Sequence, residues 1–237
     1  MDLVYSCLMH AEIIDRIKTI LHKIEVQEIM WGRQPASVKL VIVSKNVNSD
    51  LLDAAIATGC RSFAESRVVE AKKKWFDIKA NQKSPDIELR FIGRLQRNKI
   101  QDAIALFDVI ETVTSDAIAA AIVEAISNTN KSVRAYVQVN TGLEINKNGV
   151  DPRETVQFVD RCRRVHGLEI SGLMCIPPKS SNPGPHFALL HKLAREAEVF
   201  ELSMGMSDDF ETAIAMGATH VRLGRAIFGF LDSTLPR

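Results

Sequence analysis

The sequence predicts a single (β/α)8 barrel of the TIM type, preceded by one extra helix. Eight apolar, strand-like segments alternate with helix-like segments between residues 38 and 230. No two strand-like segments are joined by a short hairpin turn, so we expect a parallel sheet, and eight parallel strands close a barrel. The length of 237 residues is close to the roughly 250 residues that such a domain takes. We therefore expect one domain over 1–237, with a leading helical segment at 1–32 and the barrel at 38–230.

The leading segment is expected to be an amphipathic helix. Ile13, Ile17, Ile20 and Ile24 follow one another at helical spacing and form an apolar stripe. Charged residues interrupt its apolar stretch, and no small-residue cleavage site follows, so the segment is not expected to be a secretory signal.

The strands are recognised as short apolar runs rich in β-branched residues, and the helices by their caps and periodicity. Gly59 and Gly217 are expected to end helices, Ser115 to cap one, and Pro152 to begin another. The expected strands are Val38–Lys45, Arg61–Glu65, Glu88–Gly93, Asp108–Val113, Val133–Asn140, Glu169–Ile176, Glu201–Met204 and His220–Gly224. The expected helices are Asp50–Thr58, Ser66–Phe76, Lys99–Phe107, Ser115 to about Ser127, one starting at Pro152, His186–Phe200, Asp208–Met216 and Ala226–Phe230.

A doubly wound open sheet is the competing architecture. Its nucleotide fingerprint, G-x-G-x-x-G after the first strand, is absent, because that turn reads SKNVNSD. The Pro-rich stretch Pro177–Pro185 is expected to be a long connection on the functional face of the barrel.

The charge balance and the lack of long apolar runs limit the kinds of binding partner that we expect. Thirty basic residues balance 29 acidic ones, and no apolar run is long enough to span a membrane, so we expect no nucleic-acid or membrane partner. The four cysteines (Cys7, Cys60, Cys162 and Cys175) are scattered without a C-x-x-C pair, and the histidines show no metal-binding spacing. We expect a cytoplasmic protein with reduced thiols and no metal site.

Lys45 is the first residue that points to chemistry. It ends an otherwise apolar strand, and alternation places it on the same face as Val41 and Val43. If that face is the barrel interior, the amine lies over the mouth and is a candidate for a Schiff base. The alternative, of about equal weight, is a lysine that ends the strand and extends into solvent.

Two consecutive turns at the ends of the last two strands indicate an anion site. Ser203, Gly205 and Gly224 are small enough to leave backbone amides open, and the helix after Arg225 presents its N-terminus there. Barrels commonly bind phosphate at this place. Taken singly, each glycine more often serves only to turn the chain.

Arg222 is expected to point into the barrel. It shares a face with His220, whereas the apolar Val221 and Leu223 take the other face. A buried arginine needs an acceptor, such as an atom of a ligand. Weaker candidates are the basic cluster Arg94–Lys99, more often a solvated helix start, and Cys175, more often a small buried apolar residue.

The motifs resemble those of the pyridoxal-phosphate homeostasis proteins, whose barrel is similar to the N-terminal domain of alanine racemase. The matching strings include LVIVSK, FIGRLQRNK, FDVIETV, VQVNTGLEINKNG, GLMCIPP, LSMGMSDDFETAIAMGATHVRLG and AIFG, in order from about residue 38 to 230. The resemblance implies a fold-type III barrel with pyridoxal 5′-phosphate (PLP) linked to Lys45. It implies that the cofactor is surrounded by Lys45, Ser66, Met174, Ser203, Met204, Gly205, Arg222, Gly224 and Arg225.

The chain also departs from the family pattern. Relatives usually read SKTKP, FGEN and a histidine before FIG, where this sequence has SKNVN, FAES and Arg90. Ser66 thus replaces an asparagine near the cofactor. The resemblance also implies that Lys147 lies near the cofactor entrance, although an ordinary exposed loop lysine is the alternative.

The leading function is PLP binding for intracellular vitamin B6 homeostasis and cofactor supply, with no catalytic residue and no turnover expected. The expected ligands are PLP and other B6 vitamers, and the expected recipients are PLP-dependent apo-enzymes. Racemases of this fold type take a second base from a tyrosine on another domain, whereas only Tyr5 and Tyr136 occur here, neither at an expected strand end. The alternatives are a fold-type III amino-acid racemase or lyase and, less favoured, a barrel enzyme whose Lys45 forms a Schiff base with a phosphosugar.

Overall fold

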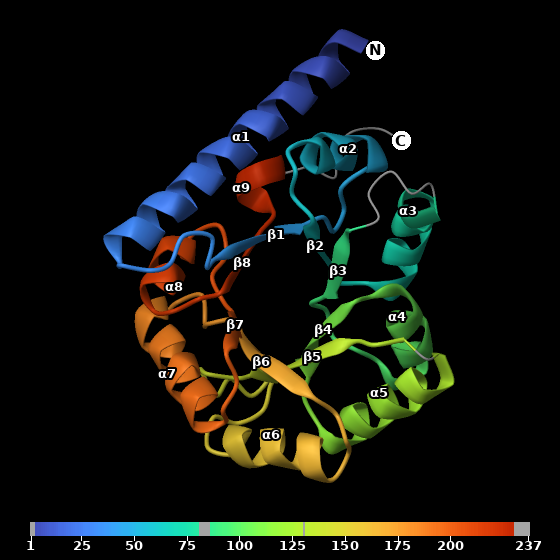
Figure 1. The fold of residues 1–237 in the computed structure, drawn as a ribbon, viewed down its shortest axis with the longest axis vertical. Coiled ribbons are helices and arrows are strands. Elements are labelled where there is room, and N and C mark those ends of the chain that lie inside the picture. Colours follow the sequence, from blue (N-terminus) through green and yellow to red (C-terminus); the bar gives the residue numbers. More distant parts are fainter. Residues whose placement is uncertain (1–2, 81–85, 130, 230–237) are drawn as a thin grey trace.

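The computed structural model describes residues 3–80, 86–129 and 131–229, and these form a closed barrel of eight parallel strands in sequence order (Figure 1). The predicted barrel is therefore confirmed, and the open doubly wound sheet is excluded. The strands are β1 (Lys39–Val43), β2 (Ser62–Glu65), β3 (Glu88–Phe91), β4 (Val109–Val113), β5 (Arg134–Val139), β6 (Ile170–Cys175), β7 (Glu201–Ser203) and β8 (His220–Leu223).

Helices surround the barrel on the outside (Figure 1). They are α1 (Leu3–Met30), α2 (Ser49–Ala57), α3 (Val68–Ala80), α4 (Ile100–Leu106), α5 (Asp116–Thr129), α6 (Thr155–Arg164), α7 (Pro183–Glu196), α8 (Phe210–Ala215) and α9 (Arg225–Phe228), with a 3-10 turn at Arg97–Lys99. No helix among the described residues combines the length and the apolar character needed to cross a membrane.

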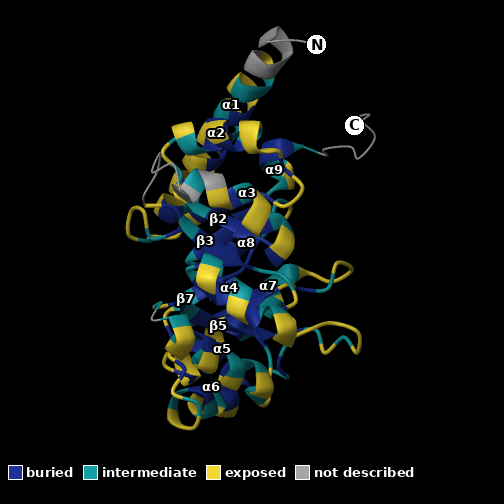
Figure 2. Cartoon of the chain, turned by 90° about the vertical axis from the view of Figure 1, so that its right-hand side faces the viewer, coloured by how far each residue is buried: buried dark blue, intermediate teal, exposed yellow. Residues whose placement is uncertain are grey.

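The apolar core divides into two parts. The larger part lies between the strands and the helices, and Figure 2 shows the buried residues inside the exposed outer surface. The smaller part comprises Val41, Val43 and Ala64, with Ile92 packed against it, and lies apart from the outer core. Alternation along β1 and β2 places these three side chains inside the barrel.

The leading helix packs on the barrel as its stripe predicts. Ile13, Ile17, Ile20 and Ile24 are all buried in the outer core, and α1 contacts α2, α8 and α9. After the helix, Arg33 donates to the carbonyls of Ile214 (3.1 Å) and Ala218 (2.6 Å), which ties the end of α1 to α8 and β8.

Several boundaries differ from the predicted ones. The predicted helix start at Pro152 is wrong, because the Asp151 side chain accepts from the Arg153 amide (2.8 Å) in a turn and α6 begins only at Thr155. The helix predicted from His186 begins earlier, at Pro183, because Asn182 caps it by accepting from the Gly184 amide (3.0 Å). Ser115 does cap α5, since its hydroxyl accepts from the Ile118 amide (3.4 Å). Phe230, in the segment predicted to start the last helix, lies outside the described residues.

Candidate functional site

Lys45 lies just beyond the barrel's first strand, which ends at Val43. Val41 and Val43 face the interior, which is the condition set for the Schiff-base interpretation, but Lys45 itself lies in a turn and is exposed. The prediction that the strand runs as far as Lys45 is therefore wrong. The turn continues through Asn46, whose φ of 60° lies in the left-handed region that asparagine tolerates better than most residues.

A buried polar contact fixes the backbone in front of Lys45. The Ser44 hydroxyl donates to the Glu65 carboxylate (2.7 Å), and the Ser44 amide donates to the Ala64 carbonyl (3.0 Å). The Lys74 ammonium donates to both the Ser44 carbonyl (2.6 Å) and Glu65 (2.9 Å). Ser44 and Glu65 are fully buried. Lys45 therefore extends from an anchored part of the barrel rim, which is the edge formed by the turns after the carboxyl ends of the strands.

The turn after β8 packs directly against the end of β1. A Cβ at Gly224 would lie 3.0 Å from the Val43 carbonyl oxygen, so only glycine permits this approach without a shift. Gly205, in the turn after β7, has a φ of +93°, and its carbonyl accepts from the Arg222 amide (2.9 Å). The two glycine turns and Lys45 therefore share one rim of the barrel.

Some of the donors predicted for an anion already have partners. The Met204 amide donates to the His220 carbonyl (3.1 Å), and the Met204 side chain is buried in the outer core. At the start of α9, the Ala226 amide donates to the Ser207 hydroxyl (3.1 Å), and Arg225 forms an ion pair with Asp208. An anion at this turn must therefore compete with Ser207 and Asp208.

Arg222 points into the barrel, as alternation predicts, but its acceptors belong to the protein. Its guanidinium donates to the Ser203 hydroxyl (2.7 Å) and to the Cys175 carbonyl (2.9 Å). Only 3% of Arg222 is exposed, so these bonds replace the water that burial removes. The expected need for an acceptor is thus met by protein atoms rather than by an atom of a ligand. Ser203 points the same way, into the barrel.

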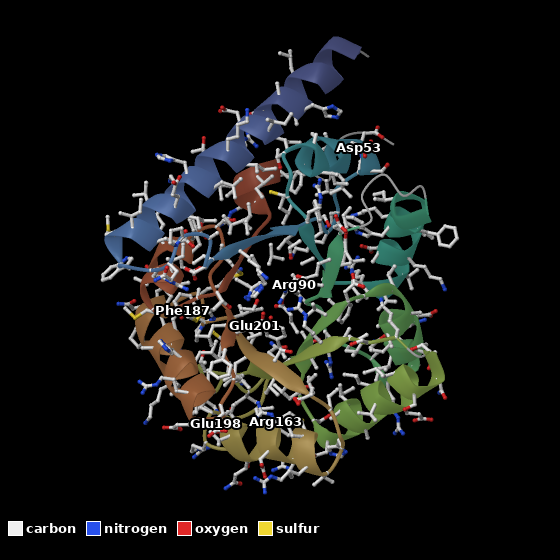
Figure 3. All side chains as sticks on the ribbon, viewed as in Figure 1. Asp53, Arg90, Arg163, Phe187, Glu198 and Glu201 are labelled. Atoms are coloured by element: carbon white, nitrogen blue, oxygen red, sulfur yellow. The ribbon has the colours of Figure 1, made fainter. Side chains whose placement is uncertain are left out.

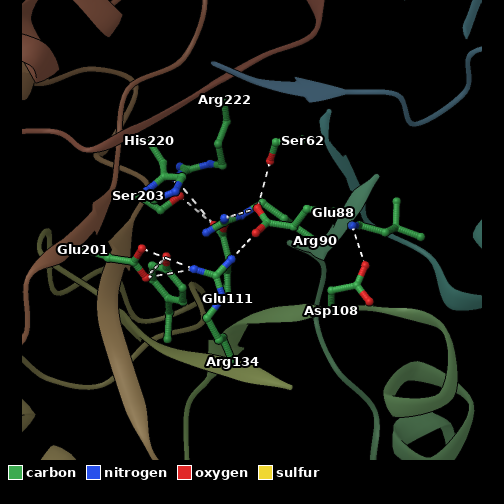
Figure 4. A network of polar contacts seen from close by, with 12 residues as sticks. Ser62, Glu88, Arg90, Asp108, Glu111, Arg134, Glu201, Ser203, His220 and Arg222 are labelled. Atoms are coloured by element: carbon green, nitrogen blue, oxygen red, sulfur yellow. Dashed lines mark hydrogen bonds and ion pairs between the residues drawn. The ribbon is translucent and has the colours of Figure 1, made fainter. Parts of the chain in front are cut away.

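Ser203 connects Arg222 to a buried ion-pair network (Figure 4). The Ser203 hydroxyl donates to one oxygen of the Glu111 carboxylate (2.6 Å), whose other oxygen accepts from Arg90 Nε (2.5 Å). Arg90 also pairs with Glu88 (2.6 Å). Arg90 and Glu111 are fully buried, and Figure 3 shows Arg90 within the ring of strands.

The network continues toward the amino ends of the strands. Arg134 pairs with Glu88 and with Glu201 (3.3 Å), and the Tyr136 hydroxyl donates to Glu201 (2.6 Å). The Arg90 guanidinium lies 5.0 Å from the centre of the Tyr136 ring. Burial raises the pKa of Tyr136 despite the nearby Arg90, so its phenol stays protonated in the physiological range.

His220 is buried beside these cations. Burial, followed by the positive charge of Arg90, lowers the pKa of His220 to about 2, so the imidazole is neutral at physiological pH. Its Nδ1 lies 2.8 Å from the Thr219 hydroxyl.

Three further predicted residues lie at other places on or near the rim. Met174 is fully buried outside the large core and pairs with Ser203 between β6 and β7. Ser66 is half-buried after β2 and lines a cavity. Lys147 is about half exposed and lies 3.5 Å from Glu144. Burial raises the pKa of Cys175 to about 12, which favours the structural interpretation of this thiol.

The sequence patterns did not predict the buried ion-pair network around Arg90 and Glu111. Glu88 and Arg90 stand two residues apart on β3, and Glu111 stands in the middle of β4, so alternating charged residues within apolar strands were the available signal. Among the described residues, no group of three His, Cys, Asp or Glu side chains is placed to hold a metal ion.

Comparisons with known proteins agree with this fold. The model of a family described as "Alanine racemase, N-terminal domain" matches residues 24–232. The chain is 37% identical to a pyridoxal phosphate homeostasis protein of Synechocystis over 204 residues, which are 82% of this chain and 92% of that protein. It is 35% identical to the human protein of that name over 211 residues, covering 82% of this chain and 77% of that protein.

Solved structures give the same result. PipY of Synechococcus elongatus without PLP superposes with a TM-score of 0.80 at 31% identity, covering 92% of this chain and 100% of that chain. PipY with PLP bound superposes with a TM-score of 0.76 at 30% identity over the same shares of the two chains. The alanine racemase of Bartonella henselae, 14% identical, has a TM-score of 0.71 and shares the fold, with 61% of its chain covered.

The closed barrel and the match to the family model over residues 24–232 define a barrel of the alanine racemase N-terminal type. Within that class, the chain belongs to the pyridoxal phosphate homeostasis protein family.

Proposed function

We propose that this chain binds PLP covalently through Lys45 and serves the intracellular supply of this cofactor in the cytoplasm rather than turning over a substrate. One observation carries the proposal: Lys45 stands on an anchored rim that it shares with the glycine turns at Gly205 and Gly224. Barrels of this kind commonly bind phosphate at the turns after their last two strands.

The residues present fit such a cofactor. Lys45 is exposed and can reach a carbonyl carbon, and Gly224 leaves room for close backbone approach. Around the phosphate we propose Ser203, Met204, Gly205, Gly224 and Arg225, with Ser66, Met174 and Arg222 nearer the ring. Met204 and Ser203 already have partners, so a ligand that binds there must replace those contacts.

When bound, PLP supplies an electron sink for reactions at the α-carbon of amino acids. The chain's own residues limit that chemistry. Arg222 is a guanidinium cation held in place by Ser203 and the Cys175 carbonyl. A fixed positive charge beside a ring nitrogen disfavours protonation of that nitrogen. Arg222 therefore weakens the electron sink if it lies beside the ring.

Tyr136 offers no second base. Its hydroxyl donates to Glu201 inside the barrel, and burial raises its pKa, so it neither reaches the rim nor ionises readily. The side chain of Tyr5 lies outside the described residues. These features favour a carrier over the alternative function, a fold-type III racemase or lyase.

The test is the absorption spectrum of the purified protein followed by borohydride reduction and peptide mapping. We expect a visible band and a reduced adduct on Lys45. Lys45→Ala should abolish both, whereas Lys147→Ala, which removes another rim-side lysine, should retain them. A label confined to a different lysine would refute the assignment, and a protein that binds a phosphosugar without a visible band would favour the aldolase-type alternative.

Catalysis and delivery need separate assays. Holo protein mixed with a PLP-dependent apo-enzyme should raise that enzyme's activity, and Lys45→Ala should not. With L- and D-amino acids we expect no change in chirality and no CO2 or keto acid. Turnover above roughly 1 s⁻¹, an ordinary enzymatic rate, that disappears in Lys45→Ala would show that the chain is an enzyme. Pyridoxal should bind much more weakly than PLP if the glycine turns hold the phosphate.

A further inference from the structure

A cavity of about 410 Å³ opens at the carboxyl ends of β2 and β3, the next two strands along the rim from Lys45. Its lining includes Ser66, Phe91, Arg94, Gln96 and Lys99. This volume lies near the lower end of the range for small-molecule sites, roughly 300–1,000 Å³. It fits a small metabolite rather than a dinucleotide.

The walls of the cavity are fixed by the sheet. Glu65 pairs with Phe91 in register between β2 and β3, and the Ile92 amide donates to the Glu65 carbonyl (2.9 Å). At Gly93 the two strand ends touch, because an added Cβ would lie 1.9 Å from the Ser66 carbonyl oxygen. The loops after β2 and β3 therefore hold their positions relative to each other.

The lining is cationic. Arg67, Arg94 and Lys99 contribute positive charges, and the one carboxylate, Glu70, already pairs with Arg67 at 2.6 Å. Arg94 and Lys99 form no ion pair with any residue in the described ranges. Gln96 adds an amide that can donate a hydrogen bond.

A solvated helix start would also place basic residues here, but it would not gather them round one cavity. Arg97 is the useful comparison. It occupies the same 3-10 turn as Lys99, at Arg97–Lys99, yet it does not line the cavity. The cavity thus takes two of the three basic side chains of the stretch Arg94–Lys99.

We propose that this cavity binds the phosphate group of a small phosphomonoester non-covalently, at a site separate from Lys45. Guanidinium groups bind phosphate oxygens in a bidentate manner, and a lysine adds a point charge, so a dianion is favoured over a monoanionic carboxylate. The ligand can be free phosphate or a phosphate ester. Ser66 is also proposed to lie near the PLP ring, but the charges that hold the phosphate here, Arg94 and Lys99, are not part of the proposed PLP site, and binding does not require Lys45.

The experiment is an NMR titration of the full-length, ¹⁵N-labelled Lys45→Ala protein at constant ionic strength. Inorganic phosphate, glycerol 3-phosphate and acetate are added separately, and the backbone amides of Ser66 and Glu70 report on the cavity. We expect saturable shifts with at least one phosphate compound, and with acetate only at concentrations at least tenfold higher. A preference for the ester over inorganic phosphate identifies an ester as the ligand, and equal affinities identify phosphate itself. Shifts of the backbone amides of Gly205 and Gly224 report binding at the glycine turns, and so distinguish that site from the cavity.

The double variant Arg94→Ala/Lys99→Ala should weaken phosphate binding at Ser66 and Glu70 at least tenfold. Arg97→Ala removes the same charge from the same turn and should change it less than twofold. If the double variant does not fold, the single variant Arg94→Ala, at an exposed position, should still weaken binding about threefold. Shifts that do not saturate, that are equal with acetate, or that survive loss of Arg94 would overturn the proposal, whether or not Lys45 carries PLP.

Discussion

Glu111→Gln tests whether the ion-pair network holds the barrel interior together. Glu111 is fully buried, and its two carboxylate oxygens accept from Arg90 Nε (2.5 Å) and the Ser203 hydroxyl (2.6 Å). Arg222 lies 4.0 Å away. A glutamine has nearly the same shape, so the substitution removes the charge and one acceptor without opening a cavity.

The cost follows from burial. Removing one partner of a buried ion pair costs about 3–5 kcal/mol, because the remaining charge stays desolvated. Glu88 still neutralises Arg90 in part, so we expect a loss of about 3 kcal/mol. For a chain of this length, 1 kcal/mol shifts the melting temperature by about 2–4 °C, which predicts a decrease of roughly 6–12 °C.

Thermal and urea denaturation followed by circular dichroism measure this loss. Asp160→Asn is the matched control, because it removes a carboxylate from the exposed pair with Arg164 and should cost less than about 1 kcal/mol. The double variant Arg90→Met/Glu111→Leu should recover part of the stability, since apolar replacements remove both desolvated charges. If Glu111→Gln unfolds within 1 kcal/mol of the parent, or no differently from the control, the network does not stabilise the fold.

Two further substitutions test the interior and the rim. Because the pKa of His220 is lowered to about 2 in the folded chain and is about 6.5 when unfolded, only the unfolded chain takes up this proton as pH falls. Stability is therefore lost progressively below about pH 6.5, by up to about 1.4 kcal/mol per pH unit. His220→Gln should make the free energy of unfolding, measured by urea titration, less dependent on pH between about pH 6 and 4. Gly93→Ala should destabilise the fold by several kcal/mol, because its Cβ collides with the Ser66 carbonyl. The control Gly184→Ala has 3.4 Å of clearance and should cost much less, with only the following Pro185 acting against an added Cβ. Equal melting temperatures for the two variants would contradict the packing at Gly93.

The sequence predicts most of the barrel because its signals are local. Alternation along β8 assigns Arg222 to the interior and Val221 to the outer core, and both assignments are confirmed. Gly59 and Gly217 adopt positive φ values where helices were expected to end. These signals need only the periods of strands and helices and the conformational freedom of glycine.

The hydrogen-bond and ion-pair partners of Arg222 could not be predicted in the same way. Ser203, Glu111 and the Cys175 carbonyl lie on β7, β4 and β6, so their meeting depends on closure of the barrel rather than on spacing along the chain. The two-residue error at the end of β1 has a similar cause. Ser44 leaves the strand because its hydroxyl donates to Glu65 and its carbonyl accepts from Lys74.

The filled interior determines where a ligand can bind. Arg90, Glu111 and Tyr136 are fully buried within the barrel, and each of them has a protein partner there. A ligand that entered the centre would have to break these contacts and leave desolvated charges behind, at a cost of several kcal/mol. Binding is therefore confined to the rim, which carries the exposed Lys45, the glycine turns and the cationic cavity. Sequence differences in the rim loops can then change the ligand without disturbing the ion-pair network below.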